Sequence, residues 1–87
     1  MIDELGKLRK KVDKIDDLIL NSLSERAAIC KTIGELKKTK HLPIRDSSRE
    51  NEVYTRVKAK ATEFELDPEQ VEAIFREIVN MCSAVQE

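Results

Sequence analysis

Apolar residues recur at helical spacing over the first 38 residues, in the longest uninterrupted pattern of the chain. Steps of mostly three and four residues are typical of one face of an α-helix. No proline interrupts the pattern until Pro43, which disfavours helical geometry at the residue before it. We therefore predict one helix from Asp3 to Lys38, with this apolar stripe: Leu5, Leu8, Val12, Ile15, Ile19, Leu23, Cys30, Ile33 and Leu36.

A helix of this length exceeds the size of a compact domain. At a rise of 1.5 Å per residue it extends roughly 50 Å, whereas a compact chain of 87 residues has a radius of gyration of about 12 Å. One chain cannot cover the whole stripe. We expect a second copy of the chain to lie along it.

Two shorter helices follow. The segment Asp46–Glu50 contains overlapping N-cap signals, with Ser47 and Glu50 at capping-box spacing. They predict a helix from about Ser47 to Glu63, whose apolar stripe is thin. Asp67 followed by Pro68 marks a third start, for a helix that continues to the end of the sequence. No strand pattern or repeat is present, so we predict one all-α domain over residues 1–87.

Composition supports an oligomer and excludes some partners. A core of this size is marginal, and two Phe, one Tyr and no Trp are available to fill it. The 16 Lys and Arg nearly balance the 17 Asp and Glu. This balance provides no field of one sign to hold a nucleic-acid backbone or an anionic membrane. We therefore expect neither partner.

The cysteines and the histidine do not suggest a metal or nucleophile site. Cys30 and Cys82 lack metal-ligand spacing and lie on apolar helix faces, and no signal peptide or membrane span precedes them. We expect reduced, buried thiols in a cytoplasmic protein. His41 has no Cys, Asp or Ser partner arranged around it. No metal or cofactor is expected.

Three cations lie at unusual places on the long helix. Arg26 falls within the apolar stripe, and Lys37, about three turns later, is on nearly the same face. Arg9 lies roughly 25 Å before Arg26 along the axis, so the two cannot hold the same small molecule within one chain. In an antiparallel helix pair, Arg9 of one chain approaches Arg26 of the other. The alternative is that their stems cover apolar surface while their charges reach water.

Other polar residues extend this set. Asp46, Arg49 and Glu50 share the first turn of the second helix, where the dipole stabilises the acids but not Arg49. Gln86 lies on the apolar face of the third helix, either frayed into solvent or directed at a polar group inside. Arginine forks suit a small molecule with several carboxylates. Without a nucleophile, catalysis would rely on orientation and preorganised electrostatics.

Several segments of the chain carry a common resemblance. They are 8–13, Ile15-Asp16 with Leu18, 24–26, 34–37, 43–46, Arg49-Glu50, and the tail from Ile74-Phe75 through Cys82 to Gln86. Together they resemble the all-helical AroQ class of chorismate mutases, over almost the whole chain and without an evident gap. The most specific part of the resemblance is the order and spacing of one set of residues: Arg26, Lys37, Asp46, Arg49, Glu50 and Gln86.

The resemblance implies an intertwined homodimer of three-helix chains that converts chorismate to prephenate for Phe and Tyr biosynthesis, without a cofactor. Each site is built mostly from one chain and completed by Arg9 of the other. The roles it implies are carboxylate binding by Arg9 and Arg26, donation to the ether oxygen by Lys37 and Gln86, contact with the ring hydroxyl by Asp46 and Glu50, and support by Arg49. Cys82 stands where bacterial relatives carry a Ser that contacts a substrate carboxylate, and a thiol is a weaker donor.

Three alternatives stay open from the sequence. An isochorismate-pyruvate lyase shares the fold and similar cations. A non-catalytic helical dimer would carry these charges on solvated faces, which does not explain Arg26 within an apolar stripe. The chain could also act as a subunit activated or regulated by a larger shikimate-pathway enzyme.

Overall fold

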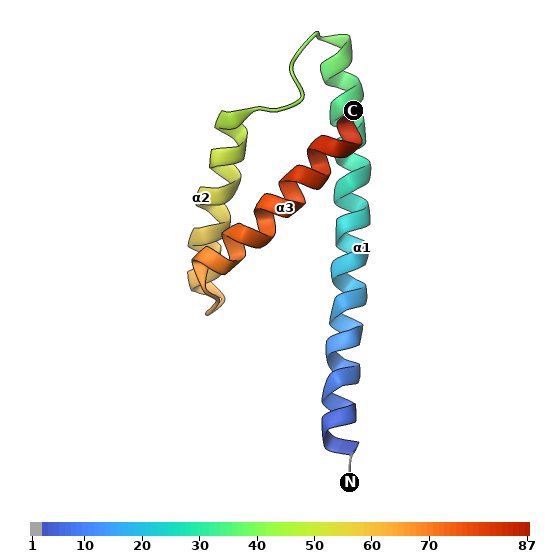
Figure 1. Cartoon of the computed structure of the whole chain (residues 1–87), viewed down its shortest axis with the longest axis vertical. Coiled ribbons are helices and arrows are strands. Elements are labelled where there is room, and N and C mark those ends of the chain that lie inside the picture. The colour runs from blue at the N-terminus through green and yellow to red at the C-terminus, as the bar shows by residue number, and fades with distance from the viewer. Residues whose placement is uncertain (1–2) are drawn as a thin grey trace.

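Three helices account for most of the chain. The computed structural model describes residues 3–87, which form α1 (Asp3–Thr39), α2 (Ser47–Glu63) and α3 (Pro68–Gln86) (Figure 1). These bounds agree with the predicted helices to within a residue or so at each end. The described residues contain no strand, which confirms the all-α fold class.

Side-chain caps fix the starts of the two shorter helices. Asp46, rather than Ser47, caps α2, because its carboxylate accepts a hydrogen bond from the backbone N–H of Arg49 at 3.1 Å. Asp67 caps α3 and accepts from two backbone N–H groups, with Pro68 at the first helical position. Each cap satisfies N–H groups that the helix itself leaves unpaired.

The C-terminal end of α2 is a tight left-handed turn. Glu65 adopts a positive φ of 58°, and its N–H donates to the carbonyl of Thr62 while the N–H of Leu66 donates to the carbonyl of Ala61. This is the Schellman arrangement. His41, with φ 56°, ends α1 in the same way. The turn at His41 directs the following loop back along α1 toward the start of α2 (Figure 1).

The core lies between α2 and α3. α3 crosses from the end of α2 to the upper part of α1 and packs against both, whereas α1 and α2 do not contact each other (Figure 1). The thin apolar stripe of α2 is buried because α3 lies on it. The buried cluster consists of Val53, Tyr54, Val57 and Val79, with Val71 and Phe75 packed against it.

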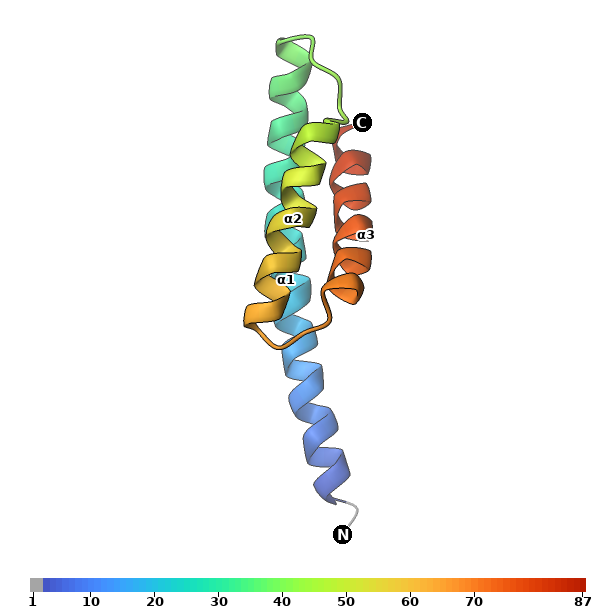
Figure 2. The same ribbon diagram turned by 90° about the vertical axis from the view of Figure 1, so that its left-hand side faces the viewer.

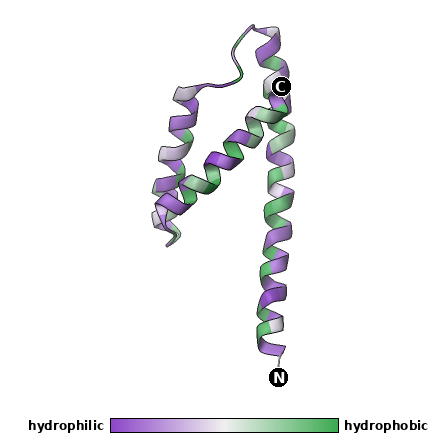
Figure 3. Cartoon of the chain, viewed as in Figure 1, coloured by the Kyte–Doolittle hydropathy of each residue, from purple (hydrophilic) through white to green (hydrophobic). Residues whose placement is uncertain are grey.

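The apolar stripe of α1 is largely uncovered. The N-terminal half of α1 projects beyond the other two helices in both views (Figures 1 and 2), and hydrophobic residues continue along it (Figure 3). The chain measures 60 × 24 × 15 Å, with a radius of gyration of 16.5 Å, well above the value of about 12 Å for a compact chain. Leu8, Val12, Ile15 and Ile19 are each more than half exposed.

No helix in the described part of the chain combines the length and hydropathy needed to cross a membrane.

Two contacts hold the end of α3 against α1. Cys30 of α1 and Cys82 of α3 form a disulfide with their Cα atoms 5.4 Å apart, so the prediction of reduced thiols was wrong. The sequence places both residues on apolar faces but does not show that these faces meet. One turn further along both helices, Gly34 packs against Gln86. A Cβ on Gly34 would lie 2.8 Å from both Cα and Cβ of Gln86.

Candidate active site

A cavity of about 290 Å³ opens between α1, the start of α2 and the end of α3. This volume is near the lower end of the range for small-molecule sites. Seven of the eight predicted site residues line it, and Arg9 does not. The lining residues are Arg26, Ile29, Cys30, Ile33, Lys37, Ile44, Asp46, Arg49, Glu50, Val53, Val79, Cys82, Ser83 and Gln86.

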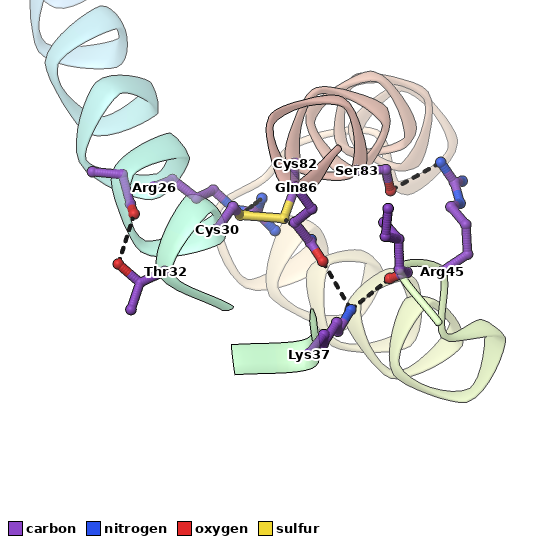
Figure 4. Close-up of a disulfide and its surroundings, with 10 residues drawn as sticks. Arg26, Cys30, Thr32, Lys37, Arg45, Cys82, Ser83 and Gln86 are labelled. Carbon is purple, nitrogen blue, oxygen red and sulfur yellow. Dashed lines mark hydrogen bonds between the residues drawn. A yellow bond between two sulfur atoms is a disulfide. The ribbon is translucent and has the colours of Figure 1, made fainter. Parts of the chain in front are cut away.

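Lys37 is fixed by two acceptors. Its Nζ donates to the backbone carbonyl of Ile44 and, at 3.0 Å, to Oε1 of Gln86 (Figure 4). An ammonium group has three N–H donors, so one remains for a ligand. The loop that precedes α2 and the end of α3 thus meet at this ammonium group.

Gln86 is buried at 8% exposure, so its amide is directed inward rather than frayed into solvent. Its Nε2 donates to Sγ of Cys82 at 3.2 Å, while Oε1 accepts from Lys37. One amide N–H therefore remains for a ligand. The close approach at Gly34 makes this burial possible, because a side chain there would push Gln86 away.

Arg26 is half-buried in the cavity wall, and its Nη1 lies 3.7 Å from Sγ of Cys30. Burial lowers the pKa of Arg26 from its ordinary value, and the nearby charges of Arg49 and Arg56 lower it further. A guanidinium group still keeps its proton at neutral pH. Arg26, Arg49 and Arg56, the arginine cluster, therefore give this part of the cavity a positive potential suited to an anion.

The acids at the start of α2 differ in their partners. Asp46 uses one carboxylate oxygen to cap the helix. Glu50 is held by Arg45, whose Nε lies 3.0 Å from Oε2 and whose Nη2 lies 3.2 Å from Oε1. Arg49 pairs only with the exposed Glu52, at 3.4 Å. An exposed pair of this kind is weak, so Arg49 can turn toward a ligand at little cost.

Arg45 is a site residue that the sequence reasoning did not single out. Besides Glu50, its guanidinium donates to Oδ1 of Asn80 at 3.2 Å and to Oγ of Ser83 at 3.0 Å (Figure 4). It therefore joins the loop, α2 and α3 at the rim of the cavity. The only signal for it was its place in the segment Pro43–Asp46, which contributed to the resemblance.

Arg9 lies on the projecting half of α1 and is exposed. Its distance of 17 residues from Arg26 corresponds to roughly 25 Å along the helix axis. It does not line the cavity of its own chain. This position is the one expected from the sequence, because Arg9 is predicted to complete the site of the partner chain rather than that of its own chain.

Comparison with known families shows which family the chain belongs to. Residues 8–87 match the family model described as chorismate mutase type II. The chain belongs to the chorismate mutase type II family. It is thus an enzyme of the isomerase class, and the all-helical fold is the one expected of this family.

Two curated relatives cover nearly the whole chain. A chorismate mutase from Methanocaldococcus jannaschii is 34% identical over 99% of the chain and 87% of its own length. A bifunctional chorismate mutase/prephenate dehydratase from Aquifex aeolicus is 36% identical over 98% of the chain. The chain spans only 24% of the length of this bifunctional protein.

A solved structure has the same fold. A conserved hypothetical protein from Pyrococcus furiosus superposes with a TM-score of 0.74 at 38% identity, with 95% of each chain covered. The arrangement of the three helices in this chain therefore matches that of a related protein of similar length.

Proposed function

We propose that two copies of this chain form a dimer that isomerises chorismate to prephenate in aromatic amino acid biosynthesis. The observation that supports this most directly is the meeting of Arg26, Lys37, Glu50 and Gln86 at one cavity. Membership of the chorismate mutase type II family supplies the reaction. The rearrangement is pericyclic and needs neither a covalent intermediate nor a cofactor.

Lys37 and Gln86 each have one N–H group that remains for a ligand, and these two groups can donate to the ether oxygen of chorismate. This oxygen gains negative charge as its C–O bond breaks, so donors aimed at it bind the transition state more strongly than the substrate. Lys37 and Gln86 already touch each other, which places their remaining donors side by side. An amide does not titrate in the neutral range, so the donor on Gln86 is independent of pH there.

The cations act on the two carboxylates of chorismate. Arg26 binds one of them and Arg9 of the partner subunit binds the other, which holds the folded conformer in which the reacting carbons approach. Arg49 supports this clamp. Asp46 and Glu50 accept the ring hydroxyl. The disulfide leaves Cys82 without a hydrogen to donate, so it contributes only contact and a weak acceptor.

The dimer follows from the shape of the chain as well as from the site. The stripe on the projecting half of α1 exposes apolar side chains over several turns, and burying them against a second α1 is favourable at about 25 cal/mol per Å². An antiparallel pairing of the two long helices brings Arg9 of the partner subunit toward the cavity. We separately predict association with a larger pathway enzyme. A relative that is a bifunctional chorismate mutase/prephenate dehydratase supports this prediction.

The test is loss of the diene absorbance of chorismate, with identification of the product, for the purified protein and for Lys37→Ala. Removing one donor to the developing charge costs on the order of 3 kcal/mol, so turnover should fall more than about a hundredfold. Lys38→Ala, which removes the neighbouring exposed lysine, is the matched control and should keep normal turnover.

The outcome has three readings. Prephenate formation supports the proposal, and a folded Lys37→Ala enzyme with near-normal turnover would remove Lys37 from the mechanism. Release of pyruvate from isochorismate, with no turnover of chorismate, would favour the lyase instead. Turnover of neither substrate by a folded dimer would favour a non-catalytic role.

A further inference from the structure

The disulfide between Cys30 and Cys82 is part of the cavity wall, and each of its sulfur atoms touches a proposed substrate-binding side chain. Sγ of Cys30 lies 3.7 Å from Nη1 of Arg26, and Sγ of Cys82 lies 3.2 Å from Nε2 of Gln86. The bond therefore has contacts on both sides of the site (Figure 4). A bond that served only to join two helices would not need to contact either group.

A disulfide sulfur has no hydrogen and can only accept. Gln86 must therefore present its N–H₂ group to Cys82, which turns its carbonyl oxygen toward Lys37. A free thiol can also donate. With Cys82 reduced, only Lys37 still requires the carbonyl oxygen of Gln86, so the orientation of the amide loses one of its two restraints.

The disulfide also fixes the distance between α1 and α3. It holds the two helices together one turn before the contact of Gly34 with Gln86. Without it, packing and the hydrogen bond from Lys37 to Gln86 keep this part of α3 against α1. The amide of Gln86 is then held less firmly in its position and orientation.

We propose that the Cys30–Cys82 disulfide is a positioning element of the active site, which holds Gln86 and Arg26 in the arrangement that binds the transition state. This inference rests on the proposed chorismate mutase function. Reduction by a dithiol breaks the S–S bond, transfers two electrons and two protons to give two thiols, and converts the dithiol to its own cyclic disulfide. Oxidation by a small-molecule disulfide reverses the step.

The experiment compares the oxidised and dithiothreitol-reduced forms of the full chain, with alkylation and mass measurement to count zero or two labelled thiols. Both forms are assayed with chorismate well below their melting temperatures, and circular dichroism checks that both are folded. We expect reduction to lower kcat on the order of 3- to 10-fold, because the donor on Gln86 is loosened rather than removed. The variant Cys30→Ser should match the reduced form and should not respond to dithiothreitol.

A spectroscopic measurement reports on Gln86 itself. Gln70 and Gln86 are the only glutamines, so their side-chain amide signals can be assigned by comparison with Gln86→Glu. Reduction should shift the Gln86 signals, and those of the exposed Gln70 should stay in place as the internal control.

Each outcome decides one claim. Equal kcat and KM for the two forms, or unmoved Gln86 signals, would overturn the positioning role even if the melting temperature fell. Two free thiols after treatment with the oxidant would overturn it as well. Lack of turnover in both forms would remove the proposed function and, with it, this inference, whereas turnover in the oxidised form secures the function whatever reduction does.

Discussion

Arg45 illustrates how one side chain can set the orientation of another. Its guanidinium grips both carboxylate oxygens of Glu50 and reaches two residues of α3. A paired arginine fork fixes a carboxylate in direction as well as in position. In the role proposed for it, Glu50 accepts the substrate hydroxyl without first having to lose rotational freedom.

Replacement of Arg45 should impair the site without abolishing it. We expect Arg45→Ala to lower kcat/KM about tenfold, the cost of freeing a carboxylate from a charged hydrogen-bond pair. Arg45→Lys keeps the charge but loses the fork, so its activity should lie between that of Arg45→Ala and that of the native protein. Steady-state kinetics with chorismate measure the effect. Equal loss in Arg45→Lys and Arg45→Ala would mean that the fork matters rather than the charge, and no loss in either would contradict the role.

At the scale of residues, the sequence predicted which side chains line the cavity better than how they are paired. Arg26, Lys37 and Gln86 stood out because helical periodicity placed them on apolar faces. The disulfide did not, because its cysteines are 52 positions apart in the chain. The Arg45–Glu50 pair did not, because Arg45 lies in a loop, where no periodic pattern indicates its direction. Periodicity reports the face of a residue but not what that face meets.

At the scale of elements, the crossing of α3 over α1 depends on the absence of a side chain at Gly34. Gly34→Ala should force Gln86 to shift, since the added Cβ meets backbone and side chain at 2.8 Å. Overpacking of this kind costs about 1–3 kcal/mol of stability, and a displaced donor should lower turnover roughly 10- to 100-fold. Thermal melts and turnover measure the two effects.

Gly6→Ala is the matched control for this substitution. Nothing lies within 4 Å of a Cβ at Gly6 in the chain, and alanine is the better helix former by up to about 1 kcal/mol. This variant should keep normal turnover. Normal turnover in Gly34→Ala as well would show that the close approach at Gly34 does not position Gln86.

A charged clasp joins α2 to α3 on the side away from the site. Hydrogen bonds from Lys58 and Arg76 lower the pKa of Glu72. A carboxylate whose pKa is depressed by folding stabilises the native state above its unfolded pKa, and this contribution is lost as the pH falls through the folded value. The clasp should therefore stabilise the chain near neutral pH and fail in acid.

The variant Glu72→Gln tests this contribution. Its melting temperature should lie below that of the native protein at pH 7, and the difference should shrink once the pH drops below the ordinary glutamate pKa of about 4.3. A difference that stays constant down to strongly acidic pH would show that packing, not charge, is responsible.

Helix bounds were predictable because their signals are local. Asp46, Asp67 and Pro68 act within one turn of the helix that they begin. Burial was less predictable. The thin stripe of α2 forms the core, and the strong stripe of α1 is exposed within one chain, because packing depends on which helices meet.

At the scale of the whole molecule, a site shared between chains permits complementation. Arg9→Ala and Lys37→Ala homodimers should both be nearly inactive. A mixed dimer contains one site with Lys37 from one chain and an intact Arg9 from the other, and a second site that lacks both. Statistical mixing should thus restore about a quarter of the native activity, since half of the dimers are mixed and each has one good site.

The measurement is turnover after the two variants are unfolded together and refolded. Refolding each variant alone is the control for recovery. No gain on mixing, with dimers confirmed by sedimentation, would contradict a site completed by Arg9 of the partner subunit. The active site would then consist of the cavity residues of one chain alone.

The arginine cluster has a consequence for how the protein responds to salt. Arg49 and Arg56 repel Arg26 while the cavity is empty, so bringing these like charges together opposes folding. Added salt screens that repulsion over a Debye length of about 8–10 Å and should favour the empty fold. The same screening weakens attraction for a substrate with two negative charges. Ionic strength therefore acts with opposite sign on the stability of the free enzyme and on its affinity for substrate.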